Sequence, residues 1–462
     1  MRLLSLSLLL VIAVALVLSP RAFASAPTQA QQSPIVVNAQ ALDVKFPRSM
    51  RFTISVTSQS PIQVLRLTVR QRGVALGTRY NPPFTPSTSV QASFEWNFQA
   101  RGFGGYLPPG THGDYTWHIE DAAGNVFDTP PQAYIVEDRS EQWQTLAKEN
   151  ITVHWHAGDP SFGNAVINRA LAARDFLTEQ LGVQDSDPLE IYIYADAQEF
   201  FGSLPAFTPE WTGGRMFPDY GVIMINFAPD RLDWGLRATS HELSHAILHA
   251  KIRGMVGELS LPHWLDEGLA VYNETNDHAP DEQFQDSFQT ALRRNSFIPL
   301  RKIQDRFPTD PDQAELAYAE SYSVIKFMMD EYGSSQFAEL LNVYQKGALP
   351  DEAIVQVYGM NQDQLENAWR KKIGAPERAI TSLGLPTIAP HPTFEISSPL
   401  GDVTPTPLPS PTVEPTTVSF SDMPVSAPSV PASFPNVPTT SMCGGTLAFI
   451  GLLLVSRLKK IK

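Results

Sequence analysis

The segment 239–274 constrains the fold more than any other part of the chain, because the spacing of its histidines and glutamates suits the binding of one metal ion. It contains an H-E-x-x-H arrangement made by His241, Glu242 and His245, and Glu267 follows 22 residues after the second histidine. On a helix, the two histidines lie one turn apart on the same face, so both imidazoles can reach one metal ion. Glu242 lies beside that face, within reach of a metal-bound water. A third protein ligand from Glu267 would leave the fourth position open, which is typical of a catalytic zinc site.

The context of these residues argues against exposed helices with incidental histidines. A helix is predicted over 231–252, and its apolar face is made by Leu243, Ala246, Ile247 and Leu248. The sequence PHWLDEGLA follows at 262–270, at a distance that suits a second helix facing the first. We therefore interpret His241, His245 and Glu267 as the ligands of one zinc ion.

The two motifs together resemble the gluzincin metallopeptidases, and among these the peptidase MA-like group. WLDEGLA at 264–270 is similar to the family's second-helix motif W-L-x-E-G-x-A, in which the glutamate is the third zinc ligand. The resemblance covers about residues 140–375 and implies an α+β, zincin-like metallopeptidase domain. It also implies that the two histidines and Glu267 bind zinc, and that Glu242 is the general base that deprotonates the zinc-activated water.

Gluzincins commonly place a tyrosine or histidine where it stabilises the oxyanion. The stretch AYAESYSVIKFMMDEYG at 317–333 resembles the family's downstream helix and offers Tyr318 and Tyr322, one turn apart. Either hydroxyl could donate to the developing negative charge. We prefer Tyr322, and core packing of one or both rings is the alternative.

The segment ahead of the active-site helix bears on the type of peptidase. Zincins keep an edge strand there that pairs with the substrate backbone, and we expect it at 222–227. The aminopeptidase branch carries a G-x-M-E-N motif whose glutamate grips the free amine of the substrate. This chain has GGRMFPDYG at 213–221 instead, which favours an endopeptidase.

Four further ionisable residues lie near the motifs in sequence. His249 is one more helical turn along, and we expect it either behind the ligands, in contact with a residue that binds them, or at the surface. Asp266 and Glu274 flank the third ligand. We expect them to be solvated helix charges, with a hydrogen bond to a ligating imidazole as the alternative. His263 is expected to be close to the site in sequence only.

The residues before the metallopeptidase region predict a separate all-β unit at 34–137. Apolar residues alternate with polar ones in several short runs, and Pro-, Gly- and Asn-rich turns separate these runs. This pattern predicts an antiparallel β-sandwich. The run PPGTHGDYTWHIEDAAGN at 108–125 resembles the penultimate strands of immunoglobulin- or fibronectin-type modules.

The region 140–375 predicts strands first and then helices, which indicates an α+β domain. Strands are expected at 150–156 and 189–194, and a turn or loop followed by a third strand at 213–227. Besides the motif helix, helices are expected at 162–181, ending at Gly182, and at 314–332, 336–346 and 363–372.

Both ends of the chain predict export and attachment. Residues 1–24 have the charged start, apolar run and A-x-A site of a signal peptide. Residues 379–441 are a Pro-, Ser- and Thr-rich stalk that lacks the apolar residues of a folded core, and 442–462 form an apolar helix with a basic tail. That helix is either a membrane anchor or a surface-sorting signal. The single cysteine, Cys443, excludes an intramolecular disulfide.

The net charge of −14 argues against a nucleic-acid partner. The gluzincin resemblance implies a peptide or protein substrate, and we expect the C-terminal helix to contact the membrane. One alternative function is a surface binding or adhesion protein whose zincin-like domain is inactive. Another is an envelope protein in which zinc only stabilises the fold. The intact ligands and Glu242 argue against the loss of activity.

Overall fold

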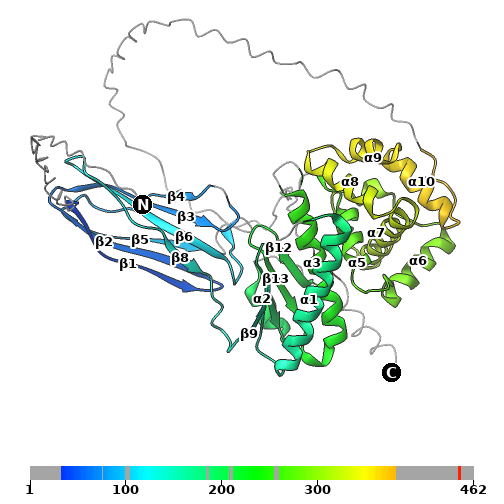
Figure 1. Cartoon of the computed structure of the whole chain (residues 1–462), viewed down its shortest axis with the longest axis horizontal. Coiled ribbons are helices and arrows are strands. Elements are labelled where there is room, and N and C mark those ends of the chain that lie inside the picture. Colours follow the sequence, from blue (N-terminus) through cyan, green and yellow to red (C-terminus); the bar gives the residue numbers. More distant parts are fainter. Residues whose placement is uncertain are drawn as a thin grey trace, which may run out of the picture. The chain divides into compact units, whose positions relative to one another are not determined.

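The computed structural model divides the chain into two compact units, Met1–Asp138 and Arg139–Lys462 (Figure 1). It describes residues 33–380, apart from 75, 99–104, 184–186, 206, 207, 209–211, 254–256, 258 and 259, together with the backbone of 446–448. The predicted signal peptide, nearly all of the predicted stalk and most of 442–462 lie outside the described residues.

The described part of the first unit consists of strands in two antiparallel sheets. One sheet has the order β1-β2-β5 and the other β4-β3-β6-β7, with β8 pairing to β6. In β2, Phe52, Ile54 and Val56 are buried in alternation, as strand geometry requires. The predicted β-sheet region is confirmed, and its likeness to immunoglobulin or fibronectin modules stays a prediction. The strands are β1 (Ile35–Lys45), β2 (Ser49–Ser58), β3 (Ile62–Gln71), β4 (Thr78–Tyr80), β5 (Ser89–Asn97), β6 (His112–Asp121), β7 (Val126–Asp128) and β8 (Gln132–Ile135).

A mixed sheet forms the base of the second unit, with the order β14-β12-β13-β11-β10-β9. Strands β10, β11 and β13 are parallel, whereas β9 and β12 run antiparallel to their neighbours. The parallel pair β10–β11 is possible because a whole helix, α1, connects the two strands. The strands are β9 (Gln144–Lys148), β10 (Ile151–Trp155), β11 (Leu189–Tyr194), β12 (Thr212–Phe217), β13 (Val222–Asn226) and β14 (Thr446–Ala448).

The prediction that 222–227 is the edge strand is wrong. β13 lies inside the sheet, between β12 and β11. The preceding residues, interpreted as a turn or loop, form β12 and pair with β13, with Gly214 opposite Ile225. Two glycines and a nearby proline gave this segment the composition of a turn, but the chain reverses only after Phe217.

Helices cover the sheet and pack on one another. α1 and α3 pack side by side and cover one face of the sheet, while α5 packs on both α3 and α7 (Figure 1). The helices are α1 (Pro160–Leu181), α2 (Ala197–Ser203), α3 (Leu232–Ile252), α5 (His263–Tyr272), α6 (Glu282–Arg294), α7 (Pro311–Tyr332), α8 (Ser334–Gln345), α9 (Pro350–Tyr358) and α10 (Gln362–Lys372), with short 3₁₀ turns η2 (Pro229–Arg231) and η3 (Leu300–Lys302). The helices predicted within 140–375 are confirmed, and α2, α6 and α9 were not predicted.

Local sequence explains where α1 begins and ends. The Asp159 carboxylate accepts hydrogen bonds from the backbone N–H groups of Ser161 and Phe162, which caps the first turn. At the other end Gly182 adopts φ 60°, a left-handed conformation that favours glycine and stops the helix. The predicted helix end at Gly182 is therefore confirmed.

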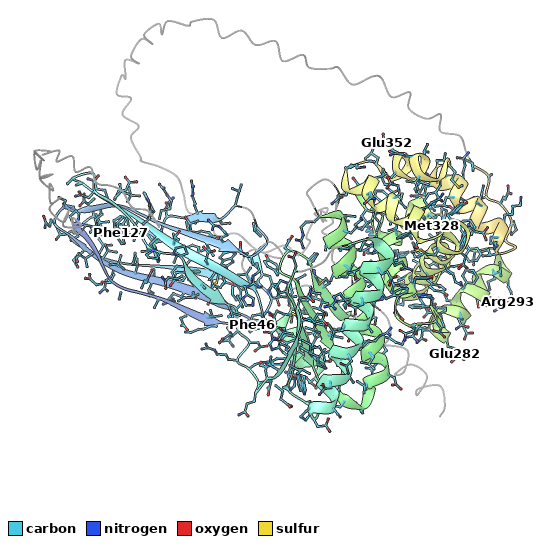
Figure 2. All side chains as sticks on the ribbon, in the orientation of Figure 1. Phe46, Phe127, Glu282, Arg293, Met328 and Glu352 are labelled. Carbon is cyan, nitrogen blue, oxygen red and sulfur yellow. The ribbon has the colours of Figure 1, made fainter. Side chains whose placement is uncertain are left out.

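The interior of the second unit is continuous from the sheet to the last helices. Met328 of α7 is fully buried, whereas the charged side chains of Glu282, Arg293 and Glu352 lie on the outside of their helices (Figure 2). This packing fixes α3, α5 and α7 relative to one another, and these helices carry the candidate site residues.

The structure describes only a small part of the predicted C-terminal helix. Within 442–462 these are Thr446–Ala448, which form β14 and pair antiparallel with β12, so the helical prediction is wrong at these three positions. A backbone paired with a strand must be extended. No helix among the described residues has the length and apolar character needed to cross a membrane.

Candidate metal centre

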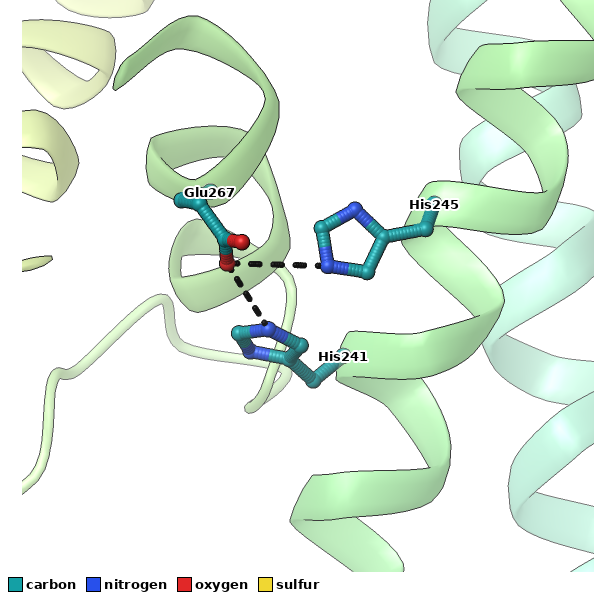
Figure 3. Close-up of side chains that lie close together, drawn as sticks. All are labelled: His241, His245 and Glu267. Carbon is teal, nitrogen blue, oxygen red and sulfur yellow. Dashed lines mark ion pairs between the residues drawn. The ribbon is translucent and has the colours of Figure 1, made fainter. Parts of the chain in front are cut away.

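His241, His245 and Glu267 converge at one fully buried point between α3 and α5 (Figure 3). The Nε2 atoms of His241 and His245 lie 3.4 and 3.6 Å from Oε2 of Glu267. Helical spacing brings the two imidazoles onto one face of α3, and the packing of α5 on α3 supplies the carboxylate. The three residues named from the sequence therefore form one cluster.

The cluster fits a tetrahedral metal ion. Zinc lies about 2.0–2.1 Å from nitrogen and oxygen ligands, so tetrahedral ligand atoms are about 3.3 Å apart. The separations of 3.4 and 3.6 Å are close to this value. Both Nε2 atoms and both carboxylate oxygens of Glu267 are buried and have no hydrogen-bond partner. Buried polar atoms are rarely left in this state, and a shared metal ion would satisfy three of the four.

Two buried carboxylates hold the imidazoles from behind. His241 Nδ1 lies 3.0 Å from Oε1 of Glu274, and His245 Nδ1 lies 2.6 Å from Oδ1 of Asp266. A carboxylate can only accept, so each Nδ1 carries the proton and each Nε2 presents its lone pair to the centre. Asp266 and Glu274 are each 2% exposed. The prediction that they are solvated charges is wrong, and the alternative of a hydrogen bond to an imidazole is confirmed.

The remaining oxygens of these carboxylates have partners as well. Arg237 Nη2 donates to Oε2 of Glu274 over 2.9 Å, and His249 Nε2 lies 3.3 Å from Oδ2 of Asp266. His249 is 4% exposed, so it is not a surface residue. It contacts Asp266, which in turn holds the ligand His245, and this is one of the two positions predicted for it. Burial raises the pKa of Asp266, but His245 and His249 outweigh this effect and hold it well below the usual range.

The carboxylates make the centre strongly attractive to positive charge. Burial lowers the pKa of His241, but Glu267 and Glu274 outweigh it and raise the pKa to about 10. Burial likewise opposes the charge on His245, but Asp266 and Glu267 raise its pKa to about 9. A buried site that favours bound protons to this degree also favours a divalent cation in their place.

Glu242 lies beside the cluster without joining it. Both of its carboxylate oxygens are buried without a hydrogen-bond partner. Burial raises the pKa of Glu242 to about 7, against the opposing effect of His245 and His241. A carboxylate with a pKa near neutrality is suited to accept a proton and later release it. The β12 backbone at Gly214 passes so close that a Cβ atom there would lie 2.6 Å from Oε1 of Glu242.

The two candidate tyrosines on α7 have different surroundings in the structure. The Tyr322 hydroxyl donates to the backbone oxygen of His278 over 2.7 Å, and burial raises the pKa of this tyrosine to about 12. Tyr318 packs edge-on against Phe307, with ring centroids 4.8 Å apart. Phe307 in turn contacts the ring of His263. The preference for Tyr322 as the oxyanion donor stays an untested prediction. Because its hydroxyl already donates to His278, whereas Tyr318 is linked through Phe307 to His263 beside the ligands, we now prefer Tyr318 for this role.

His263 was expected to be near the site in sequence only, and this expectation is wrong. Its Nε2 lies 3.7 Å from Oε1 of the ligand Glu267. The signal was its position four residues before Glu267, which places both side chains on one face of α5. The sequence did not reveal which atoms of Glu267 face that side.

Residues 169–375 match the family model described as Peptidase MA superfamily. The match covers less than half of the chain. The matched segment contains the two histidines, Glu242 and Glu267, and together with the buried ligand cluster it supports a zincin-like zinc metallopeptidase. No curated protein matches the chain in sequence.

Two solved structures have a low structural likeness to part of this chain. An M1 zinc metallopeptidase from Deinococcus radiodurans is 14% identical, with 73% of this chain and 94% of that chain covered and a TM-score of 0.35. An aminopeptidase N family protein from Idiomarina loihiensis is 11% identical, with 72% and 75% covered and a TM-score of 0.36. Likeness at this level assigns neither substrate nor bond preference.

Proposed function

We propose that this protein is an exported, membrane- or surface-tethered zinc endopeptidase. The observation that carries the proposal is the convergence of His241, His245 and Glu267, whose inward-facing atoms are buried and unpartnered, with Glu242 beside them. A site that only stabilised the fold would have no use for a buried carboxylate next to its ligands. Glu242 therefore favours catalysis over a structural role for zinc.

In this proposal a side chain of the protein transfers the proton of the attacking water to the leaving group. Zinc, when bound, supplies a Lewis acid that polarises the scissile carbonyl and activates water. Glu242 accepts the proton of the attacking water on a carboxylate oxygen and passes it to the nitrogen of the leaving amine. Glu274 and Asp266 hold the Nδ1–H groups of the two histidines, so the imidazoles keep their orientation throughout the reaction.

The endopeptidase assignment is supported by β12. This strand passes close to Glu242 at Gly214. One edge of β12 pairs with β13, and its other edge pairs with extended backbone, which in this structure is that of β14. An extended peptide paired to this strand would run past the general base. The segment 213–217 contains no carboxylate to grip a substrate's free amine. We therefore assign internal peptide bonds as the substrate.

The location outside the cytoplasm is supported by sequence alone. Residues 1–24 have the pattern of a signal peptide, and 379–441 have the composition of a stalk. The basic tail after the apolar run at the C-terminus favours attachment there.

Cleavage of a peptide library by the wild type and by Glu242→Gln tests the proposal, with free and acetylated N-termini compared. The wild type should cleave both kinds of peptide, and the variant should lose a factor of about 10²–10⁴ in rate while keeping its zinc. Glu190→Gln is the matched control, because Glu190 also faces an imidazole, that of His154 at 2.8 Å, but belongs to β11. Cleavage limited to free N-termini would contradict the endopeptidase assignment. A zinc-loaded wild type that cleaves nothing would indicate a binding protein instead.

A further inference from the structure

One oxygen of the ligand Glu267 remains unexplained by the metal cluster. Its Oε2 faces both imidazoles, at 3.4 and 3.6 Å. Its Oε1 points elsewhere, is buried, and has no hydrogen-bond partner. A buried carboxylate oxygen without a donor is costly, so this atom requires a partner in the working protein.

His263 is placed to be that partner. It is the first residue of α5, one turn before Glu267, and its Nε2 lies 3.7 Å from Oε1. A hydrogen bond of ordinary length, about 2.9 Å, needs a movement of only about 0.8 Å by two side chains. Hydrogen bonds in active sites are often this long before the site is filled. The imidazole in its Nε2–H form supplies the missing donor.

The neighbours of His263 restrict its ring. Its backbone N–H donates to the carbonyl oxygen of Gln304 over 2.6 Å. The ring packs edge-on against Phe307, with centroids 4.6 Å apart. Its side chain is 18% exposed, whereas that of Glu267 is fully buried. His263 thus stands at the boundary between the buried ligands and solvent.

We propose that His263 is a positioning residue that donates from Nε2 to Oε1 of Glu267 and so makes this carboxylate bind metal through Oε2 alone. The inference rests on the proposed function, because it concerns the metal at that site. A carboxylate that used both oxygens would occupy a further position around the ion. With Oε1 held by His263, that position stays available to water and substrate.

Two substitutions separate this role from simple packing. His263→Phe keeps a ring against Phe307 but removes the donor. His263→Gln removes the ring but keeps an N–H donor at nearly the same reach. A positioning role predicts that the glutamine variant resembles the wild type, and a packing role predicts that the phenylalanine variant does.

The readout is the visible absorption of the full chain loaded with Co²⁺ in place of zinc, together with kcat and KM for a cleaved peptide. Four-coordinate Co²⁺ absorbs more strongly than Co²⁺ with added ligands. We expect His263→Phe to show weakened absorption and a kcat lowered about 10- to 100-fold with little change in KM. His263→Gln should restore both. Thermal unfolding of each variant verifies that it is folded.

The matched control is His156→Phe. His156 also packs edge-on against an aromatic ring, that of Trp143 at 5.1 Å, and faces a carboxylate, that of Glu199 at 3.2 Å. It should leave the Co²⁺ spectrum unchanged. A wild-type spectrum and kcat in His263→Phe would overturn the inference, as would a glutamine variant that fails like the phenylalanine variant. A wild type that binds neither Co²⁺ nor zinc would overturn the inference and the proposed function together, which is a different result.

Discussion

Replacing Gly214 by alanine should damage catalysis far more than folding. Gly214 belongs to β12, and a Cβ atom at this position would lie 2.6 Å from Oε1, 3.0 Å from Cδ and 3.0 Å from Cγ of Glu242. All three contacts involve the side chain of the proposed general base and none involves backbone. The absence of a side chain at Gly214 is therefore what allows the strand to approach Glu242.

The size of the effect follows from these distances. Ordinary contact begins at 3.4 Å, so the Glu242 carboxylate must move by about 0.8 Å. Misplacing a reacting group by about 1 Å can lower a rate by about 10²-fold, which is about 2.7 kcal/mol in the barrier. Because the end of a side chain can rotate away, we expect a loss of only about 1 kcal/mol in the free energy of unfolding.

The assay compares kcat for a cleaved peptide, bound zinc and the thermal midpoint in wild type, Gly214→Ala and Gly202→Ala. An added Cβ at Gly202, on α2, meets nothing within 4 Å, so this control should keep full activity. Gly214→Ala should lose about 10²-fold in kcat, keep its zinc and melt within a few degrees of wild type.

Full activity in a folded Gly214→Ala protein would refute the reasoning, because Glu242 would then tolerate the displacement that the contact requires. An equal loss in Gly202→Ala would also refute it, because the effect would then be unrelated to Glu242.

Two further predictions concern α7. Burial holds the pKa of Glu320 well above its usual range, against the backbone N–H of Ile298 and Arg370. The folded state therefore keeps a proton that the unfolded state releases, and stability should fall as the pH rises above the unfolded pKa of about 4.3. Urea unfolding at pH 5 and pH 8 should show a smaller fall in Glu320→Gln, and equal falls would contradict the shift. Tyr322→Phe should lose about 1 kcal/mol of stability with kcat nearly unchanged, since its hydroxyl serves the His278 carbonyl. Tyr318→Phe should instead lower kcat by about 10²–10³-fold, and the reverse pattern would favour Tyr322 as oxyanion donor.

Local geometry was sufficient to predict that the two histidines face one point, whereas Glu267, on a separate helix, was identified as a ligand by the resemblance of WLDEGLA to the gluzincin motif. Histidines four residues apart on a helix face the same way wherever the helix lies. The apolar face of α3 and the left-handed Gly182 likewise depend on neighbouring residues alone. These features need no knowledge of what packs against them.

The missed features depend on tertiary structure. The order of strands in a sheet is set by pairing between distant segments, so the sequence did not show that β13 is internal and β12 lies outside it. Asp266 and Glu274 look like solvated charges on a short helix, and only the packing of α5 on α3 buries them against the imidazoles. The two glycines before Arg215 looked like a turn, whereas Gly214 allows close approach to Glu242.

Zinc titration of the metal-stripped full chain tests the central claim most directly, with wild type compared to Glu267→Gln. Glutamine keeps the size of the side chain but lacks the charge that faces both imidazoles. We predict one zinc ion per wild-type chain and an affinity for the variant that is lower by more than about 100-fold. A wild type that takes up no zinc, or a variant that binds it equally well, would contradict the assignment of the site.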